Sequence, residues 1–208
     1  MDEKNVEIDQ LKKSTFNFMD LKEKSLENII STEDIIACIS SNLLSIIQKN
    51  KKLKNKPKKG PNEPLYSKLI PALTLEKFLI RIIKYTEAEN NTLIVAYLYI
   101  IKLIKIENFI LSLNNVYRLL LGAAVLAKKV LEDLTYNNLY YCEIGGLSVE
   151  ELNRVEFSLF VRINFDVNPK REEVNDIYKN IFKSFPSSKI NRVSTLYGNI
   201  ELDPIKIK

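Results

Sequence analysis

The chain has 208 residues, of which 46% are hydrophobic, with a formal net charge of +5, two cysteines and no histidine. This length and composition predict one hydrophobic core with a tail. The lack of histidine removes the commonest general base, the Ser-His and Cys-His pairs and most zinc sites, although carboxylate, lysine or tyrosine chemistry stays open. Cys38 and Cys142 form no C-x-x-C pattern, so neither a disulfide framework nor a thiolate metal site is expected, and a reducing compartment is favoured.

No stretch has the character of a targeting or membrane segment. Met1–Leu11 alternates charged and isolated apolar residues and lacks the apolar core of a signal peptide. The longest apolar run, Leu93–Ile101, is too short to span a bilayer and is followed by Lys102 and Lys105. We therefore expect an intracellular protein, nuclear or cytoplasmic, that has no membrane partner.

Three segments precede the main helical region. Residues 1–31 are polar and form an extension that we expect to be partly disordered. Within residues 32–50, apolar side chains recur at helical spacing and predict an amphipathic helix that Ser31 or Thr32 can cap. Residues 51–69 form a basic linker or loop.

The linker contains most of a lysine tract, which ends just before Gly60 and Pro61. The lysines of the tract are Lys49, Lys51, Lys52, Lys54, Lys56, Lys58 and Lys59. The tract is a nuclear-import signal, a tether for an acidic partner, or a solvated loop whose charges repel one another. No aromatic residues lie between the lysines to stack on bases, so the solvated loop is favoured.

From residue 70 to residue 186 the pattern is almost entirely helical and predicts an all-α fold. Leu75–Ile83 carries an apolar stripe opposite charged residues, as a surface helix does. Leu93–Ile106 is apolar nearly all round, and its length favours a central buried helix over a strand. Asn91 or Thr92 can cap that helix.

Asn114 or Asn115 can cap the third helix of this region, in which apolar residues recur at i, i+3 and i+4 and small residues would let a neighbouring backbone approach. Lys129 lies on a strip beside the main apolar stripe, which implies a second, shallower contact surface. Alternatively, Lys129 only pairs in water with Glu132 or Asp133, a contact that contributes about 0.3 kcal/mol.

A short aromatic helix or turn, Tyr136–Ile144, stops at Gly145-Gly146. Ser148 and Glu151 then form an S-x-x-E capping box, in which each residue satisfies a backbone N–H of the other. This pattern predicts that a helix begins at Ser148.

Glu156 lies within the apolar stripe of that helix, four residues from Leu152 and from Phe160. A carboxylate enclosed by apolar side chains is costly to desolvate unless it has a cationic or N–H partner, and Lys129 on the preceding long helix is the obvious candidate. Alternatively, Glu156 lies at the margin of the stripe and reaches solvent. Periodicity leaves both interpretations open.

Asn168 and Pro169 are expected to cap and open the last helix, and Pro186 to end it. Residues 187–208 form a C-terminal tail.

The residues also carry a resemblance to a known family. Leu113–Val167 reads LNNVYRLLLGAAVLAKKVLEDLTYNNLYYCEIGGLSVEELNRVEFSLFVRINFDV and resembles the centre of the cyclin box of the P-type, phosphate-signalling cyclins. Ile70–Leu103 is similar to the first two helices of the box, and Ile36–Asn50 to the helix that precedes it. The resemblance covers roughly residues 33–185. It implies a five-helix cyclin box at residues 70–186, preceded by an additional N-terminal helix.

The resemblance implies a regulatory subunit that binds and activates a cyclin-dependent protein kinase, with no catalytic residues, cofactor, metal or small-molecule substrate of its own. In the family, a lysine near the end of the third helix and a glutamate in the fifth form a pair on the kinase-facing surface. By motif position these residues are Lys129 and Glu156. The apolar residues that would meet the regulatory αC helix of the kinase are Leu126, Val130, Phe160, Phe165 and Val167.

The sequence departs from the family pattern at Ile101, where an aspartate is usual, and at Tyr117, where a histidine is common. Only residues 187–208 follow Pro186, so we expect a single-box cyclin without a second helical repeat. The alternative is a cyclin-box adaptor or transcription-related module that binds nucleic acid or another protein without activating a kinase, or a purely structural bundle. Nucleic acid is not expected as a partner because the basic residues cluster before the box, and an enzyme is not expected because the chain has no histidine and no Gly-rich phosphate loop.

Overall fold

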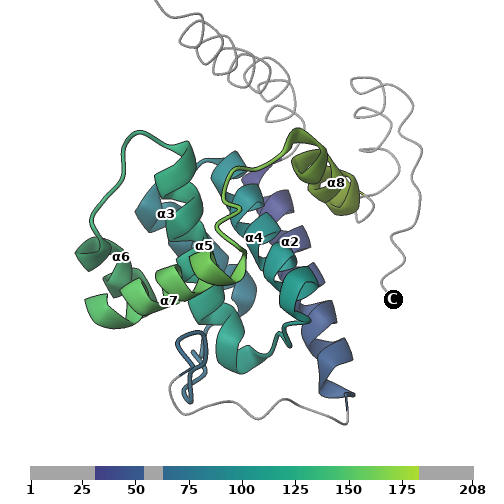
Figure 1. The fold of residues 1–208 in the computed structure, drawn as a ribbon, viewed down its shortest axis with the longest axis horizontal. Helices are drawn as coiled ribbons and strands as arrows, with labels where there is room; N and C mark the ends of the chain where they lie inside the picture. The colour runs from purple at the N-terminus through teal and green to yellow at the C-terminus, as the bar shows by residue number, and fades with distance from the viewer. Residues whose placement is uncertain (1–30, 54–62, 183–208) are drawn as a thin grey trace, which may run out of the picture.

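A computed structural model of the protein describes residues 31–53 and 63–182 (Figure 1). Within these two ranges the chain forms seven α-helices and no strand, so the predicted all-α fold is confirmed. The predictions for the extension before Ser31, for Lys54–Lys59 and for the end of the last helix and the tail lie outside the described residues. The helices are α2 Thr32–Lys51, α3 Leu75–Thr86, α4 Asn90–Glu107, α5 Leu113–Leu131, α6 Asn138–Gly145, α7 Val149–Arg162 and α8 Arg171–Phe182.

Helix α2 is the predicted N-terminal helix, and Ser31 caps it. The Ser31 hydroxyl accepts a hydrogen bond from the backbone N–H of Asp34 at 3.2 Å. Acidic residues in the first turn and lysines in the last turn complement the helix dipole. The apolar face, with Ile39 and Leu43 fully buried, packs against α3, α4 and α8.

Helix α4 forms the centre of the molecule. Residues 92–100 are all buried, and the helix packs against α2, α5, α7 and α8. This confirms the central buried helix, because a helix that is apolar all round must be covered on every side. The predicted caps, Asn91 and Thr92, are wrong: both lie inside the helix, whose N-cap is Glu89. The Thr92 hydroxyl instead donates a hydrogen bond to the Glu132 carboxylate at 2.6 Å.

The predicted cap of α5 is also wrong, because the N-cap is Ser112 and not Asn114 or Asn115. Asn115 occupies the third helical position, where its side-chain oxygen accepts a hydrogen bond from the backbone N–H of Ser112 at 2.8 Å. A polar side chain three residues after the cap satisfies a backbone N–H at the same helix end as the cap does. The two positions therefore favour similar residues and are hard to distinguish in sequence.

The capping box of α7 is confirmed. The Glu151 N–H donates to the Ser148 hydroxyl at 3.1 Å, and the Glu151 carboxylate accepts from the Ser148 N–H at 2.9 Å. The hydrogen bond from the Ser148 backbone lowers the pKa of Glu151, and Arg118 adds to this effect. Gly146, with a φ of 64°, ends α6 just before the box in the left-handed conformation that favours glycine.

Helix α8 begins at Arg171, two residues later than the predicted start at Pro169. The side chain of Glu173 accepts a hydrogen bond from the backbone N–H of Lys170 at 3.0 Å, and this contact fixes the first turn after Pro169.

The arrangement of the helices leaves α7 on an outer face. In Figure 1, α7 crosses in front of α5, and α8 lies against α2 and α4 on the other side of the molecule. In the part of the chain that the structure describes, no helix combines the length and the apolar character needed to span a bilayer.

Candidate functional site

Lys129 and Glu156, which lie 27 residues apart in sequence, form an ion pair between the last turn of α5 and the middle of α7. The Lys129 ammonium donates to both carboxylate oxygens of Glu156, at 2.7 and 2.8 Å. The predicted pairing is therefore confirmed. The sequence also allowed Lys129 to pair with Glu132 on its own helix. In the structure, Glu132 pairs with the neighbouring lysine, Lys128.

The pair is partly buried, and it is more buried on the glutamate side. The side chain of Glu156 is 15% exposed and that of Lys129 is 34% exposed. Lys129 carries three N–H donors and gives two of them to Glu156, so the third can bind an acceptor on a partner. The pair can thus present both a donor and a negatively charged acceptor at the surface.

The amide of Asn138 is a third member of this site that the sequence did not reveal. Its Nδ2 donates to the Glu156 carboxylate at 3.0 Å and to the side-chain oxygen of Asn153 at 2.5 Å. The side-chain oxygen of Asn138 is buried and makes no hydrogen bond. Asn138 opens the short helix α6 and would be recognised only from the tertiary contact, because a single polar residue at a helix start has many ordinary roles.

Close packing of α5 against α7 brings the two charged side chains together. A methyl group on Gly122 would lie 2.6 Å from Cγ1 of Val155, one residue before Glu156. Any side chain at position 122 would therefore force Val155, or α7 with it, to shift. The small residues of α5 have the consequence that the sequence predicted: a close approach of a neighbouring backbone.

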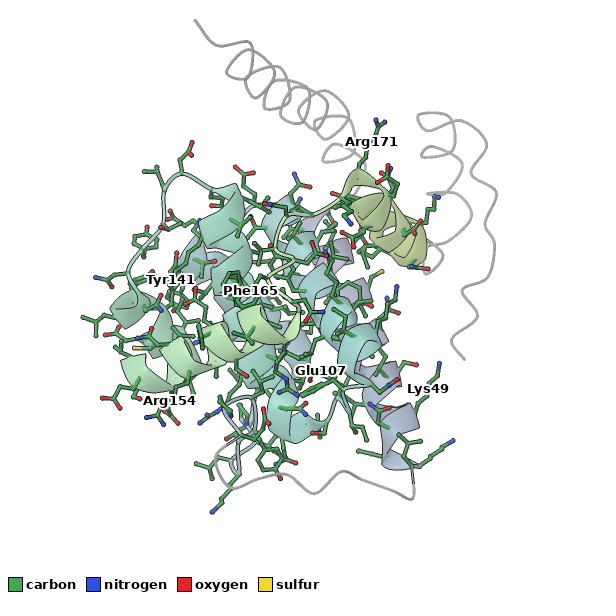
Figure 2. The ribbon with its side chains drawn as sticks, in the orientation of Figure 1. Lys49, Glu107, Tyr141, Arg154, Phe165 and Arg171 are labelled. Atoms are coloured by element: carbon green, nitrogen blue, oxygen red, sulfur yellow. The ribbon has the colours of Figure 1, made fainter. Side chains whose placement is uncertain are left out.

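The predicted apolar site residues differ in how far they reach the surface. Phe165 is 59% exposed, and its ring meets that of half-buried Phe160 edge to face, with 4.9 Å between ring centres. Val130 is half-buried, and Val167 is half-buried against the core. Leu126 is only 7% exposed and contributes mainly to the core. Of the five, Phe165 is the side chain most available to a partner, and Figure 2 labels it at the end of α7.

Three further apolar side chains on α6 and α7 are exposed besides the predicted residues. Phe157 and Val161 lie one turn apart on the outer face of α7, and Leu139 lies on α6, which packs against α7. Large apolar side chains that gather on one face indicate an interaction surface. The sequence signal was present, because Phe157 and Val161 repeat at i and i+4 outside the buried stripe.

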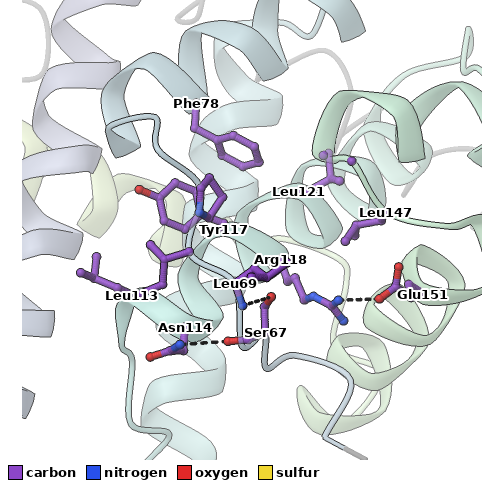
Figure 3. A pocket seen from close by; sticks show the side chains of 14 residues that line it. Ser67, Leu69, Phe78, Leu113, Asn114, Tyr117, Arg118, Leu121, Leu147 and Glu151 are labelled. Carbon is purple, nitrogen blue, oxygen red and sulfur yellow. Dashed lines mark hydrogen bonds and ion pairs between the residues drawn. The ribbon is translucent and has the colours of Figure 1, made fainter.

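A concave region separate from the Lys129–Glu156 pair lies between the loop before α3, the first half of α5 and the start of α7. Its cavity has a volume of about 340 Å³ (Figure 3). Arg118 crosses it, donating to the Pro64 carbonyl at 3.2 Å and pairing with Glu151 at 2.5 Å. Its guanidinium is thus engaged within the protein. Among the described residues, no three His, Cys, Asp or Glu side chains are grouped so that they could hold a metal ion.

Comparisons with known proteins agree with this architecture. A family model described as Cyclin matches residues 23–167. Cyclin-U2-2 of Arabidopsis thaliana is 32% identical over 155 residues, which are 72% of this chain and 67% of that protein. Cyclin-U2-1 of the same plant is 37% identical over 100 residues, 48% of this chain and 45% of that protein. Cyclin-P3-1 of Oryza sativa subsp. japonica is 27% identical over 143 residues, 68% of this chain and 61% of that protein.

The identities to the two U-type cyclins exceed the identity to the P-type cyclin, so the match supports the family and does not single out the P-type subfamily. The match to Cyclin-U2-1 spans less than half of that protein. The family model, in contrast, covers α2 to α7 and most of the chain. The chain therefore belongs to the cyclin family.

Proposed function

We propose that this protein is a regulatory subunit that binds and activates a cyclin-dependent protein kinase. Cyclin-family proteins are regulatory subunits and not enzymes, and membership in the family supports the same role here. The docking surface is formed by α5 and α7, the third and fifth of the five helices from α3 to α7. It would receive the regulatory αC helix of the kinase.

One observation carries this proposal most strongly. The ion pair of Lys129 and Glu156 lies at the edge of the core, and Phe160, one turn after Glu156 on α7, meets the exposed ring of Phe165 edge to face. Charged groups that keep a free donor and acceptor next to exposed aromatic rings match the composition of protein interfaces, where aromatic anchors supply area and polar groups fix register. Leu126, Val130 and Val167 are the other apolar residues that would meet the αC helix.

The protein would act on the kinase by position and would form no covalent bond. A kinase needs the ion pair between its strand lysine and its αC glutamate, and a metal-binding aspartate, in place before it transfers phosphate. A cyclin surface that holds the αC helix inward stabilises that arrangement and raises the population of the active state.

The subfamily and the location are further parts of the proposal. Similarity to Cyclin-P3-1 supports a P-type assignment, and similarity to Cyclin-U2-2 supports a U-type assignment. An intracellular location, nuclear or cytoplasmic, agrees with Cys38 and Cys142 being buried and not joined in a disulfide.

The test is capture of a kinase from native extract, followed by reconstitution with the purified kinase and an assay of phosphate transfer to a protein substrate. Glu156→Ala and Lys129→Ala should each reduce activation about tenfold, a change of about 1.4 kcal/mol. Both variants should still unfold cooperatively, because the pair is partly exposed and such pairs contribute little to folding.

Arg118→Ala is the matched control, because it breaks the other ion pair between α5 and α7 and lies outside the docking surface. It should leave activation as in the wild type. A wild type that neither binds nor activates a kinase, or site variants that activate fully, would show that the proposed function is wrong.

A further inference from the structure

The turn that follows α7 is held in an unusual backbone conformation. Asn164 and Phe165 have φ values of 56° and 61°, so two consecutive residues other than glycine are left-handed. Asparagine tolerates this conformation, but in an aromatic residue it is strained by about 1 kcal/mol or more. Strain of this kind persists only where the surrounding structure imposes it.

Part of the turn is an ordinary helix ending. The N–H of Phe165 donates to the carbonyl of Phe160 at 3.0 Å, and the N–H of Asn164 donates to the carbonyl of Val161 at 2.9 Å. This is the Schellman pattern, in which a left-handed residue follows the helix and an apolar contact joins the next residue to the last turn. The edge contact between Phe165 and Phe160 is that apolar contact. The pattern requires one left-handed residue, which is Asn164, and does not require the second.

Two side chains of α4 donate hydrogen bonds to the backbone immediately after Phe165. The Lys102 ammonium pairs with the Asp166 carboxylate at 2.7 Å and also donates to the Asp166 backbone carbonyl at 3.3 Å. The Tyr99 hydroxyl, one turn earlier on α4, donates to the carbonyl of Val167 at 2.6 Å. Burial raises the pKa of Tyr99, and the charge of Asp166 adds to the rise, so the hydroxyl keeps the proton that it donates.

Lys102 is placed where a lysine is costly. Lys102 is 6% exposed and follows the apolar run Leu93–Ile101 within α4. All three of its N–H donors have acceptors, since Glu173 of α8 accepts at 3.0 Å in addition to the two groups of Asp166. Replacing a whole buried ionic cluster, both signs of charge together, by apolar side chains of similar size is often neutral or favourable for stability, so stability alone does not explain why this cluster is present.

We propose that Lys102 is a positioning residue for partner binding: it clamps Asp166, and with Tyr99 it holds the turn so that the ring of Phe165 stays at the docking surface. This inference rests on the proposed function for the identity of the partner. The clamp itself is a property of the free protein and can be measured without any kinase.

The first measurement is amide hydrogen exchange in the free protein. Lys102→Met should speed exchange of the Phe165 and Val167 amides about tenfold, because their hydrogen bonds depend on the clamped turn, while core amides of α5 stay protected. Lys102→Arg should restore protection, because it keeps the charge and the donors. Tyr99→Phe removes the hydrogen bond to Val167 without leaving a charge unpaired, so it should speed exchange by a smaller factor. It replaces Lys102→Met in this measurement if Lys102→Met does not fold.

Glu173→Gln is the matched control. Glu173 contacts the same ammonium but belongs to α8 and not to the turn, so its neutral variant should leave exchange at Phe165 unchanged.

The second measurement is a double-mutant cycle for affinity toward a purified cyclin-dependent kinase. Lys102→Met should weaken binding about tenfold in the wild-type background and less than about twofold in the Phe165→Ala background, because the lysine acts through the ring. A merely structural role would lower affinity equally in both backgrounds.

The outcomes separate the two proposals. Unchanged exchange at Phe165 and Val167 in folded Lys102→Met, or equal losses of affinity in both backgrounds, would overturn the clamp and leave the proposed function standing. A wild type that binds no kinase would overturn the proposed function, and with it the docking role of Phe165, whatever the exchange result.

Discussion

The Glu156 carboxylate lies between core and solvent, and this position determines what its ion pair can do. Fully exposed pairs contribute little to stability and hold no fixed geometry, whereas fully buried pairs cost desolvation energy and cannot be reached. With Glu156 more buried than Lys129, the carboxylate is held by Lys129 and Asn138 while the ammonium stays accessible. In the proposed function, the pair would therefore be preorganised before the kinase binds.

The sequence could predict this pair only in part. The apolar neighbours of Glu156 at i−4 and i+4 indicated a need for a cation, and Lys129 lay beside an apolar stripe. Asn138 could not be predicted, because its contact crosses between helices α6 and α7, and one polar residue has no periodic signal. The exposure of Phe165 depends on a left-handed turn, which the Asn164-Phe165 pair does not signal, because an aromatic residue disfavours it.

Tyr97 gives the free energy of unfolding a pH dependence in the alkaline range. Burial raises the pKa of Tyr97 to about 12, partly offset by a hydrogen bond with Asn42. The folded pKa therefore exceeds the unfolded value near 10, so this contribution to stability is fully present below about pH 10 and is lost as the pH rises from about 10 to about 12.

We predict that Tyr97→Phe makes the fall in the free energy of unfolding between about pH 10 and about pH 12 shallower, by up to about 1.4 kcal/mol per pH unit. Denaturant unfolding at several pH values measures this slope. At pH 8 the variant should lose about 1 kcal/mol, because its hydrogen bond with Asn42 is absent. An identical slope in the two proteins would mean that Tyr97 ionises no differently in the folded and unfolded chain.

Among the elements, the crossing of α5 and α7 determines the geometry of the site. Gly122 permits that crossing, since Val155 occupies the space in which a side chain would lie. The cap of α7 fixes where the helix begins and hence which residues of α7 meet α5. Gly122 and the cap of α7 are both local features of the sequence, and both determine how close Lys129 lies to Glu156.

Gly122→Ala should therefore lower the free energy of unfolding by about 2 kcal/mol through overpacking, although alanine is the better helix former. It should also weaken kinase activation, because α7 moves away from α5. Chemical denaturation checks the first effect. Val155→Ala removes the clashing methyl groups, so the double variant should be less destabilised than the sum of the single variants. Strict additivity would mean that the two residues do not clash.

The helix boundaries show what local sequence determines. The cap of α7 was predictable because two interlocking side chains define it. The starts of α4 and α5 were predicted two to three residues late, because polar residues in the first turn resemble a cap in sequence, whereas the start of α8 was predicted two residues early, at Pro169. For α5 the side chain concerned, Asn115, lies three residues after the cap.

At the scale of the whole molecule, α4 is surrounded by other helices, and α2 completes the cover on one side. The sequence predicted this arrangement well, because apolar character all round a helix has one physical solution in water. The relative placement of the helices was harder to predict from the sequence, because it depends on contacts such as those of Gly122 and Lys102.

If α2 belongs to the same cooperative unit as the box, then Ile39→Ala should destabilise the whole protein by about 3 kcal/mol, because Ile39 is fully buried. Leu44→Ala on the exposed side of the same helix is the control and should cost less than about 0.5 kcal/mol. Near-ultraviolet circular dichroism and far-ultraviolet circular dichroism should report one transition. Loss of α2 alone in a separate, earlier transition would show that α2 folds independently.

Lys129 and Glu156 are proposed to face a kinase, and exchanging their charges tests this claim. Lys129→Glu and Glu156→Lys, made singly, place like charges together and should lower both the midpoint of thermal unfolding and kinase activation. The double variant restores opposite charges within the protein but reverses them toward a partner. We predict that it recovers the unfolding midpoint of the wild type and activates the purified kinase at most about one tenth as well. Recovery of activation together with stability would contradict the claim, because the pair would then only join α5 to α7.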